Sequence, residues 1–186
     1  MAKTICFTGK RPKDMYGYRS REPYDTLQKK VCLWLCQIAR EGEITHSITG
    51  GAQGFDQVAF WACKDAGIAY KSVYLPFYGQ ERYWAKNGLF GRQEYAIMLL
   101  AAEEVRPCSL IDSTSASGRE ISAAYLKRNH DMVDASDIVL GCLDTRIDFH
   151  YDRSGTAATL RYAEAHGKGI FLIDVNSLQV TKYRVP

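Results

Sequence analysis

The first segment with distinctive chemistry is TGKRP, residues 8–12, which follows a short apolar run. Thr8 offers a hydroxyl group, and Gly9 permits a sharp turn because glycine has no Cβ atom. Arg11 supplies a planar guanidinium, and Pro12 fixes the backbone at that point. A hydroxyl and a guanidinium held together in one turn are suited to binding an anion.

A second segment, residues 49–56, places a glycine pair before a predicted helix. Gly50 and Gly51 lead to a helix that we expect to begin between Gly54 and Asp56. Glycine amides and the unpaired N–H groups at a helix N-terminus can both contact an anion closely. A glycine pair before a helix is also common in ordinary turns, and Asp56 is a favourable capping residue, so a structural role stays open.

A third segment, RSGTAATLRYAEAHGKGI at residues 153–170, repeats the second pattern. Ser154, Gly155 and Thr156 begin a predicted helix after a predicted strand. Thr156 also suits a helix start for structural reasons alone. Because all three segments follow predicted strands, their joint occurrence favours a ligand site that holds phosphate.

Known cofactor and metal motifs are not found in this sequence. No GKS or GKT follows the glycines, and there is no GxGxxG, so an ATP-hydrolysing motor and an ordinary dehydrogenase are disfavoured. We expect no cofactor. The six cysteines form no CxxC pair, which favours structural thiols. We expect no metal, because the histidines are scattered, at positions 46, 130, 150 and 166.

Short apolar runs alternate with longer amphipathic ones along the chain. The runs predict strands at 4–8, 46–49, 70–75, 103–108, 137–143 and 169–174, and the amphipathic segments predict helices at 24–40, 55–66, 91–102, 118–132 and 156–166. This order predicts an α/β fold, with residues 1–186 forming a single Rossmann-like domain. We expect a mostly parallel sheet of about six strands with helices on both faces, and a ligand beyond the carboxyl ends of the strands.

Residues 76–93 are rich in aromatic and charged side chains and resemble an insertion. Aromatic side chains close to the exit of the third predicted strand could stack on a base near Arg82, or they could close a dimer; they are Tyr74, Phe77, Tyr78, Tyr83 and Trp84. Homo-oligomers are common for this fold class, so we expect one here.

The composition limits the cellular setting and the partners. A net charge of +3, spread along the chain, favours anions mildly and does not indicate a protein that coats DNA. We find neither a charged and apolar leader nor an apolar run of the ~20 residues that a membrane span requires. The sequence therefore predicts a cytoplasmic protein without a membrane partner.

The motifs together resemble the SLOG superfamily. The matching stretches are FTGKRP (7–12), ITGGAQGFDQVAFWACKDAG (48–67), LPFYGQE (75–81), RNHDMVDASDIVLGCLD (128–144) and SGTAATLRYAEAHGKGI (154–170). Within the superfamily, the chain is most similar to the family of bacterial and phage proteins typified by YpsA. The resemblance implies a Rossmann-like fold and a pocket for a nucleotide or a nucleotide-derived ligand.

The family motif assigns ligand binding to specific positions of this chain. They are Thr8, Gly9, Arg11, Pro12, Gly50, Gly51, Gly54, Asp56, Arg128, Asn129, Gly155 and Thr156. Arg128 could reach an anion, while Asn129 could bond to backbone or base groups. Substituting Gly51 by Val or Arg128 by Ala is expected to abolish ligand capture without unfolding the chain.

Three departures from the superfamily pattern affect the expected activity. Hydrolases of the LOG type use a glutamate where this chain has Thr159, and a threonine cannot act as a carboxylate base. Ser154 replaces a glycine, and Lys10 replaces the usual histidine of the first turn. The catalytic acid that a hydrolase needs would have to come from elsewhere, and the weak candidates are Glu81, Glu120 and Asp56.

The sequence favours a binding protein over an enzyme. We expect capture of a nucleotide-like molecule, such as an ADP-ribose-like signal, by a sensor or sequestering protein in phage or bacterial defence. The alternative is an enzyme that cleaves the N-glycosidic bond of a nucleoside or nucleotide. A third hypothesis, single-stranded DNA binding like that of DprA, requires a basic stripe that the modest charge does not indicate.

Overall fold

The computed structural model describes residues 2–42, 44–84 and 88–184. Its strands are β1 (Lys3–Gly9), β2 (Ile44–Thr49), β3 (Tyr70–Leu75), β4 (Glu104–Pro107), β5 (Ile138–Leu143), β6 (Gly169–Asp174) and β7 (Val180–Arg184). Its α-helices are α1 (Glu22–Gly42), α2 (Phe55–Asp65), α3 (Arg92–Leu100), α4 (Gly118–Asp134) and α5 (Gly155–Ala165). Two short 3-10 helices, η1 (Pro12–Asp14) and η2 (Gln80–Tyr83), complete the described elements.

The strands form one seven-stranded sheet in the order β4-β3-β2-β1-β5-β6-β7. Strands β1 to β6 are parallel, and β7 pairs with β6 in the antiparallel direction. The predicted single Rossmann-like α/β domain is thus confirmed. Each predicted strand and helix has a counterpart, and β7 is a further strand that the apolar pattern did not indicate.

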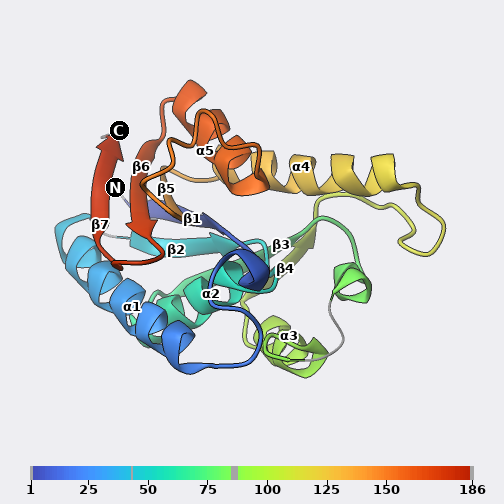
Figure 1. Ribbon diagram of the computed structural model, residues 1–186, viewed down its shortest axis with the longest axis horizontal. Coiled ribbons are helices and arrows are strands. Elements are labelled where there is room, and N and C mark those ends of the chain that lie inside the picture. Colours follow the sequence, from blue (N-terminus) through green and yellow to red (C-terminus); the bar gives the residue numbers. More distant parts are fainter. Residues whose placement is uncertain (1, 43, 85–87, 185–186) are drawn as a thin grey trace.

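Helices cover both faces of the sheet (Figure 1). Helices α1, α2 and α3 lie on one face, and α4 and α5 lie on the other. Side chains of strand β1 contribute to the core on both faces of the sheet. Ile5 and Phe7 are buried toward α1 and α2, whereas Cys6 is buried toward α4 and α5. This alternation is the two-residue period of a strand that is buried on both faces.

Gly141 of β5 allows α5 to lie very close to the centre of the sheet. A Cβ atom at this position would lie 2.8 Å from Cδ2 of Leu160. Any larger residue would therefore push α5 away from β5. Because Gly141 pairs with Thr8 of β1, the same close contact sets the distance between the first turn and the start of α5.

The aromatic segment at 76–84 divides between the core and the surface. Phe77 is fully buried and Trp84 is 9% exposed, whereas Tyr78 is 62% exposed. The hydroxyl of Tyr83 donates a hydrogen bond of 2.5 Å to the carbonyl oxygen of Ser113, which ties the segment to the loop before α4. Residues 85–87 of the expected insertion lie outside the described residues.

Two further findings concern membranes and metals, within the part of the chain that the structure describes. No helix there combines the length and the apolar composition needed to cross a bilayer. No group of three or more His, Cys, Asp or Glu residues is arranged to hold a metal ion there.

Candidate functional site

A cavity of about 370 Å³ opens where the strand order of the sheet reverses, beyond the carboxyl ends of β1 and β5. In open parallel sheets this switch point is where ligands bind. The cavity is lined by Phe7, Thr8, Gly9, Lys10, Arg11, Lys13, Asp14, Ala52, Asp56, Tyr125, Arg128, Asn129, Met132, Ser154, Gly155 and Thr156. It therefore brings the first and third sequence segments together with α4 and with Ala52 and Asp56 of the second segment.

The segment after β1 forms one wall of the cavity. The amide of Lys10 donates a 3.3 Å hydrogen bond to the carbonyl of Cys142, which holds the turn against β5. Pro12 then begins η1, a position that suits its fixed φ angle. The guanidinium carbon of Arg11 lies 5.9 Å from the centre of the Tyr125 ring, and its side chain makes no hydrogen bond to any described residue. Arg11 thus presents a cation to the cavity.

The N-terminus of α5 forms the opposite wall. Ser154 is the N-cap residue, and its hydroxyl accepts a 3.3 Å hydrogen bond from the amide of Ala157. The amides of Gly155 and Thr156 come first in the helix, where no intrahelical acceptor exists, and they bond to no other described group. A Cβ atom on Gly155 would meet nothing within 4 Å. An anion can therefore reach these amides directly.

A buried ion pair forms the floor of the cavity. Nη1 of Arg128 lies 3.4 Å from Oδ2 of Asp56, and the two side chains are 6% and 9% exposed. The guanidinium passes directly over Gly50, where a Cβ atom would lie 1.2 Å from Nη1. Nε of Arg128 is buried and has no hydrogen-bond partner among the described residues. A buried guanidinium nitrogen without a hydrogen-bond partner lowers the stability of the folded state, so its presence calls for a functional or a structural reason.

Burial raises the pKa of Asp56 above its ordinary value, although Arg128 and Arg11 act in the opposite direction. The amide of Ala52 also donates a 3.2 Å hydrogen bond to its carboxylate. A carboxyl group whose pKa lies above the usual range is the kind of group that can act as a general acid near neutral pH. Asp56 is the one expected catalytic candidate that lines the cavity.

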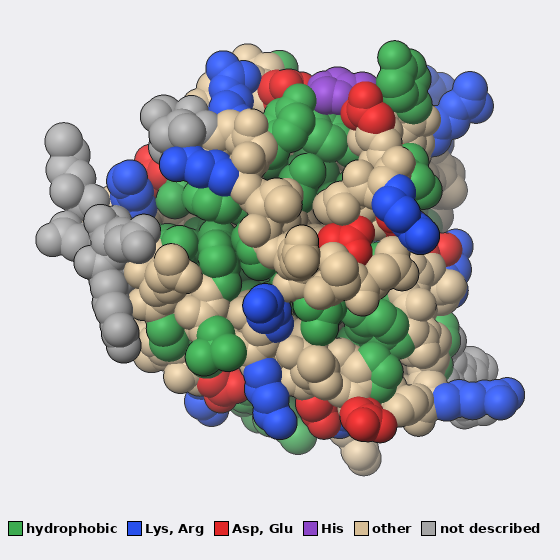
Figure 2. Space-filling model, turned by 60° about the vertical axis from the view of Figure 1, so that its left-hand side comes forward, with side chains coloured by type: hydrophobic (Ala, Val, Ile, Leu, Met, Phe, Trp, Pro, Cys, Tyr) green, Lys and Arg blue, Asp and Glu red, His purple; other side chains and the backbone are tan. Residues whose placement is uncertain are grey.

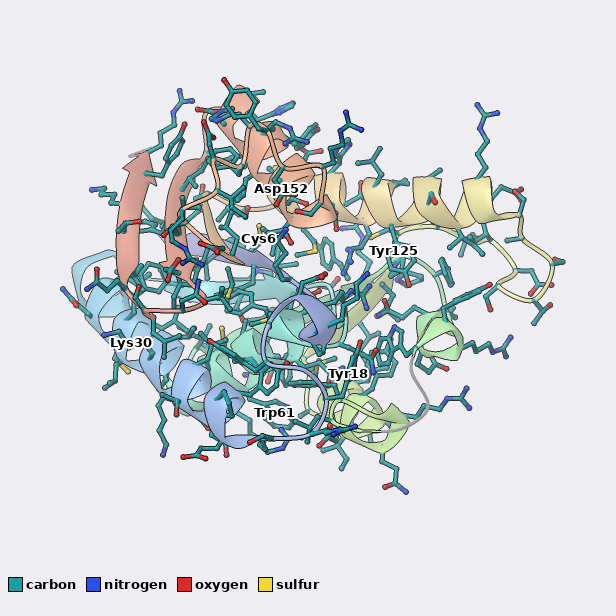
Figure 3. All side chains as sticks on the ribbon, viewed as in Figure 1. Cys6, Tyr18, Lys30, Trp61, Tyr125 and Asp152 are labelled. Atoms are coloured by element: carbon teal, nitrogen blue, oxygen red, sulfur yellow. The ribbon has the colours of Figure 1, made fainter. Side chains whose placement is uncertain are left out.

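Tyr125 is a cavity residue that sequence reasoning missed. It projects from α4 toward the aromatic segment (Figure 3), where Phe77 contacts it edge-on with a ring separation of 5.7 Å. Its ring centre lies 5.8 Å from the guanidinium carbon of Arg128. No motif contains Tyr125. Its spacing of three and four residues from Arg128 and Asn129 could have placed it on the same face of α4.

Four of the expected binding residues lie outside the lining of the cavity; they are Pro12, Gly50, Gly51 and Gly54. The carbonyl of Gly50 accepts a 3.2 Å hydrogen bond from Gln80, and Gly51 has a φ angle of +66°. The glycine turn thus supports Arg128 and Asp56 from behind, and contact between its own amides and a ligand stays a prediction.

The other catalytic candidates lie away from the cavity. Glu120 is exposed at the start of α4, where it forms a capping box with Ser117. Glu81 lines a separate hollow beside Trp84. Thr159, which stands at the position of the hydrolase glutamate, donates a 2.8 Å hydrogen bond from its hydroxyl to the carbonyl of Gly155. Met132 and Val133 of α4 are buried core residues.

Comparison with known proteins gives one relative and one solved structure of note. The chain is 31% identical over 125 residues to the uncharacterized SPbeta prophage-derived protein YoqJ of Bacillus subtilis, covering 63% of this chain and 68% of YoqJ. Its fold is similar to that of DNA processing protein A (DprA) of Streptococcus pneumoniae, with a TM-score of 0.55 and 16% identity. That similarity covers 96% of this chain and spans about half, 52%, of the DprA chain.

The family relationship rests on a match along almost the whole chain. Residues 5–178 match the model of the YpsA family, described as the YspA SLOG family. This range includes all three segments that converge on the cavity and the whole of α4. The chain therefore belongs to the YpsA family of SLOG proteins.

Proposed function

We propose that this protein binds a nucleotide or a nucleotide-derived small molecule in the cavity between β1 and β5. The observation that carries the proposal is the convergence of Arg11 with the two unpartnered amides at the start of α5, Gly155 and Thr156. Both groups favour a phosphate. Membership of the SLOG family supports the same ligand class.

The rest of the lining suits the remainder of such a ligand. Tyr125 offers part of an aromatic ring, and Asn129 offers an amide that can both donate and accept hydrogen bonds. The cavity volume of about 370 Å³ falls within the range of small-molecule sites. An ADP-ribose-like molecule combines phosphate, ribose and base, which are the three chemistries that these residues recognise.

We place this binding activity in a sensor or sequestering protein of the cytoplasm. The prophage-derived relative supports a setting in which phages and bacteria compete. The six free cysteines fit a reducing compartment.

The test is retention of defined nucleotides by the purified protein. The protein is incubated with AMP, NAD, ADP-ribose and cyclic ADP-ribose isomers, filtered and denatured, and the released compounds are identified by mass spectrometry. Retention of an intact nucleotide is the expected result. Arg11→Gln should weaken retention by about tenfold or more, because a charge-assisted contact to phosphate is lost.

A matched control separates charge at the site from charge in general. Arg119 is exposed at the start of α4 and does not line the cavity, so Arg119→Gln makes the same charge change elsewhere. It should bind as the unmodified protein does. Equal retention by the Arg11 and Arg119 variants would remove Arg11 from the site. Retention of none of the four probes would overturn the proposal.

Cleavage of an N-glycosidic bond is a second candidate function, because Asp56 lines the cavity and its pKa is raised. A protonated Asp56 could donate its proton to the departing base while a water molecule attacks the anomeric carbon, loses a proton and yields the free sugar. Release of free base from AMP or NAD, detected in the same assay, would support it. In that case Asp56→Asn should abolish release while intact nucleotide is still retained.

DNA binding gains no support from the charge distribution on the face drawn in Figure 2. Lys and Arg side chains there are interspersed with Asp, Glu and hydrophobic groups and form no continuous stripe. The structural similarity to DprA is a similarity of fold at 16% identity.

A further inference from the structure

An ion pair joins the two walls of the cavity. Nζ of Lys10 lies 2.6 Å from Oδ2 of Asp152, and the two side chains are only 18% and 16% exposed. Lys10 belongs to the turn after β1. Asp152, which Figure 3 labels, lies in the loop before α5. The pair thus connects the two segments whose groups we propose to bind an anion.

Asp152 also organises the start of α5. Its Oδ1 accepts a 2.8 Å hydrogen bond from the amide of Ser154, and its Oδ2 accepts a 2.9 Å hydrogen bond from the Ser154 hydroxyl. That hydroxyl in turn caps α5 by accepting from the amide of Ala157. Asp152 therefore fixes the orientation of the cap and of the two unpartnered amides that follow it.

The same carboxylate places a negative charge beside the N-terminus of α5. Although burial acts to raise the pKa of Asp152, the Lys10 ammonium and the hydrogen bonds from Ser154 hold that pKa below its ordinary value. Asp152 is thus ionised at neutral pH, next to amides that favour anions. Lys10, which lines the cavity, supplies the ammonium that pairs with this carboxylate.

We infer that the Lys10–Asp152 pair is a charge-selectivity device, in which Asp152 positions the start of α5 and keeps the Lys10 ammonium paired, so that the cavity accepts less negative charge than it would with Lys10 free. This inference rests on the proposed function, because it concerns the phosphate of the same ligand. Among the described residues that line the cavity, Lys10 pairs with Asp152 and Arg128 pairs with Asp56. Arg11 and the exposed Lys13 are the lining cations without an ionic partner among these residues. A phosphodiester or a pyrophosphate linkage, with one charge per phosphorus, matches this arrangement better than a terminal phosphate dianion.

The test is a double-substitution cycle read by calorimetric titration at pH 8. The probes are AMP, whose phosphate is a dianion, 3′,5′-cyclic AMP, whose phosphodiester carries one charge, and inorganic pyrophosphate. Asp152→Asn keeps the size of the side chain and an oxygen for the Ser154 amide, and it removes the charge. Lys10→Met keeps the approximate length of the side chain and removes the ammonium. If the Lys10→Met variant does not fold, the Lys10→Gln variant is used in its place.

Each variant has a distinct expected result. For AMP, Asp152→Asn should tighten binding about tenfold and Lys10→Met should weaken it about tenfold, as expected for one charge several ångströms from the phosphate. For cyclic AMP each change should be only about threefold, because the interaction energy scales with the charge of the ligand. The double variant should bind each probe within about threefold of the unmodified protein.

The ion pair Lys127–Asp131 on α4 is a matched control. It has the same residue types and the same 2.6 Å separation, and neither residue lines the cavity. Removing it with Lys127→Met and Asp131→Asn should leave all three affinities unchanged.

Other outcomes separate this inference from the proposed function. If AMP binds but the double variant remains as weak as Lys10→Met, Lys10 contacts the phosphate directly and the inference is overturned while the proposed function stands. Equal changes for AMP and cyclic AMP also overturn it. If inorganic pyrophosphate, the most highly charged probe, is the one probe that binds, the charge limit and nucleotide binding both fail. If no probe binds, both fail.

Discussion

The contact between Gly50 and Arg128 shows how one residue can determine the shape of the cavity floor. A Cβ atom on residue 50 would lie 1.2 Å from Nη1 of Arg128 and 2.6 Å from Oδ2 of Asp56. Both charged groups are buried, so neither can move aside into water. The glycine therefore determines where the buried ion pair can form.

Gly50→Ala should displace Arg128 and leave Asp56 buried without its partner, lowering the free energy of unfolding by about 3 kcal/mol. Urea unfolding measures this change. Gly155→Ala is the matched control, because a Cβ atom there meets nothing within 4 Å, and it should change stability by less than about 0.5 kcal/mol. Equal unfolding midpoints for the two variants would contradict this account of Gly50.

Sequence reasoning identified the residues of the site better than the role of each one. Thr8, Arg11, Arg128 and Thr156 line the cavity, whereas Gly51 lies behind it. Gly51 has a positive φ angle, and a Cβ atom there would lie 2.9 Å from Val73. Gly51→Val should therefore strain the fold, against the expectation that it leaves the fold intact. A motif marks a glycine without showing whether a ligand or the core requires it.

Among the elements, the turn from β6 to β7 depends on one carboxylate. Asp174 accepts hydrogen bonds from the amide and the hydroxyl of Thr145, at 2.8 and 2.9 Å, and from the amides of Asn176 and Ser177, at 3.0 and 2.7 Å. Burial acts to raise the pKa of Asp174, but these hydrogen bonds outweigh it and hold that pKa far below its ordinary value. Asp174 thus fastens β7 and the loop after β5 to the end of β6.

Asp174→Asn should lower the free energy of unfolding by about 2 kcal/mol at pH 7. Because the pKa is depressed in the folded state, this stabilisation is fully present above the unfolded value of about 3.9 and is lost as pH falls below it. Urea unfolding at pH 7 and at pH 3 should show the difference between variant and unmodified protein shrinking at the lower pH. Asp65→Asn, at an exposed position, should have little effect at either pH. A pH-independent loss at Asp174 would exclude its charge as the cause.

The predicted elements and the missed strand differ in how much apolar surface they bury. Strand β5 is entirely buried, β3 is buried after Tyr70, and the centre of β1 is buried, which gives the continuous apolar runs that identify a parallel sheet. In β7, Val180 is half-buried and the next four residues are exposed, so no such run exists. Backbone pairing with β6 holds this strand in place, and side-chain patterns do not record backbone pairing.

For the whole molecule, ligand binding should appear as added stability. A ligand at a hundred times its dissociation constant stabilises the folded state by about 2.7 kcal/mol. For a domain of this size the unfolding temperature should rise by roughly 5 to 10 °C. Thermal unfolding with ADP-ribose measures this rise, which Arg11→Gln should reduce at the same ligand concentration and Arg119→Gln should not. An equal rise in both variants would place the ligand elsewhere.

Self-association stays a prediction from the fold class. Large hydrophobic side chains with high exposure occur on several elements, including Leu33 on α1 at 69% and Leu100 on α3 at 87%. Light scattering of the purified protein measures the subunit number directly.

The position of β1 beside β5 has a consequence for the order of folding. Thr4 and Asp137, which exchange hydrogen bonds at the start of these strands, lie 133 residues apart in the sequence. Closing so long a loop is slow and entropically costly, so the strands that are local in sequence can pair first. The cavity lies between β1 and β5, so a folding intermediate in which these two strands have not yet paired has no binding site. Ligand capture during refolding would therefore report the final step of assembly, later than the gain of helical signal.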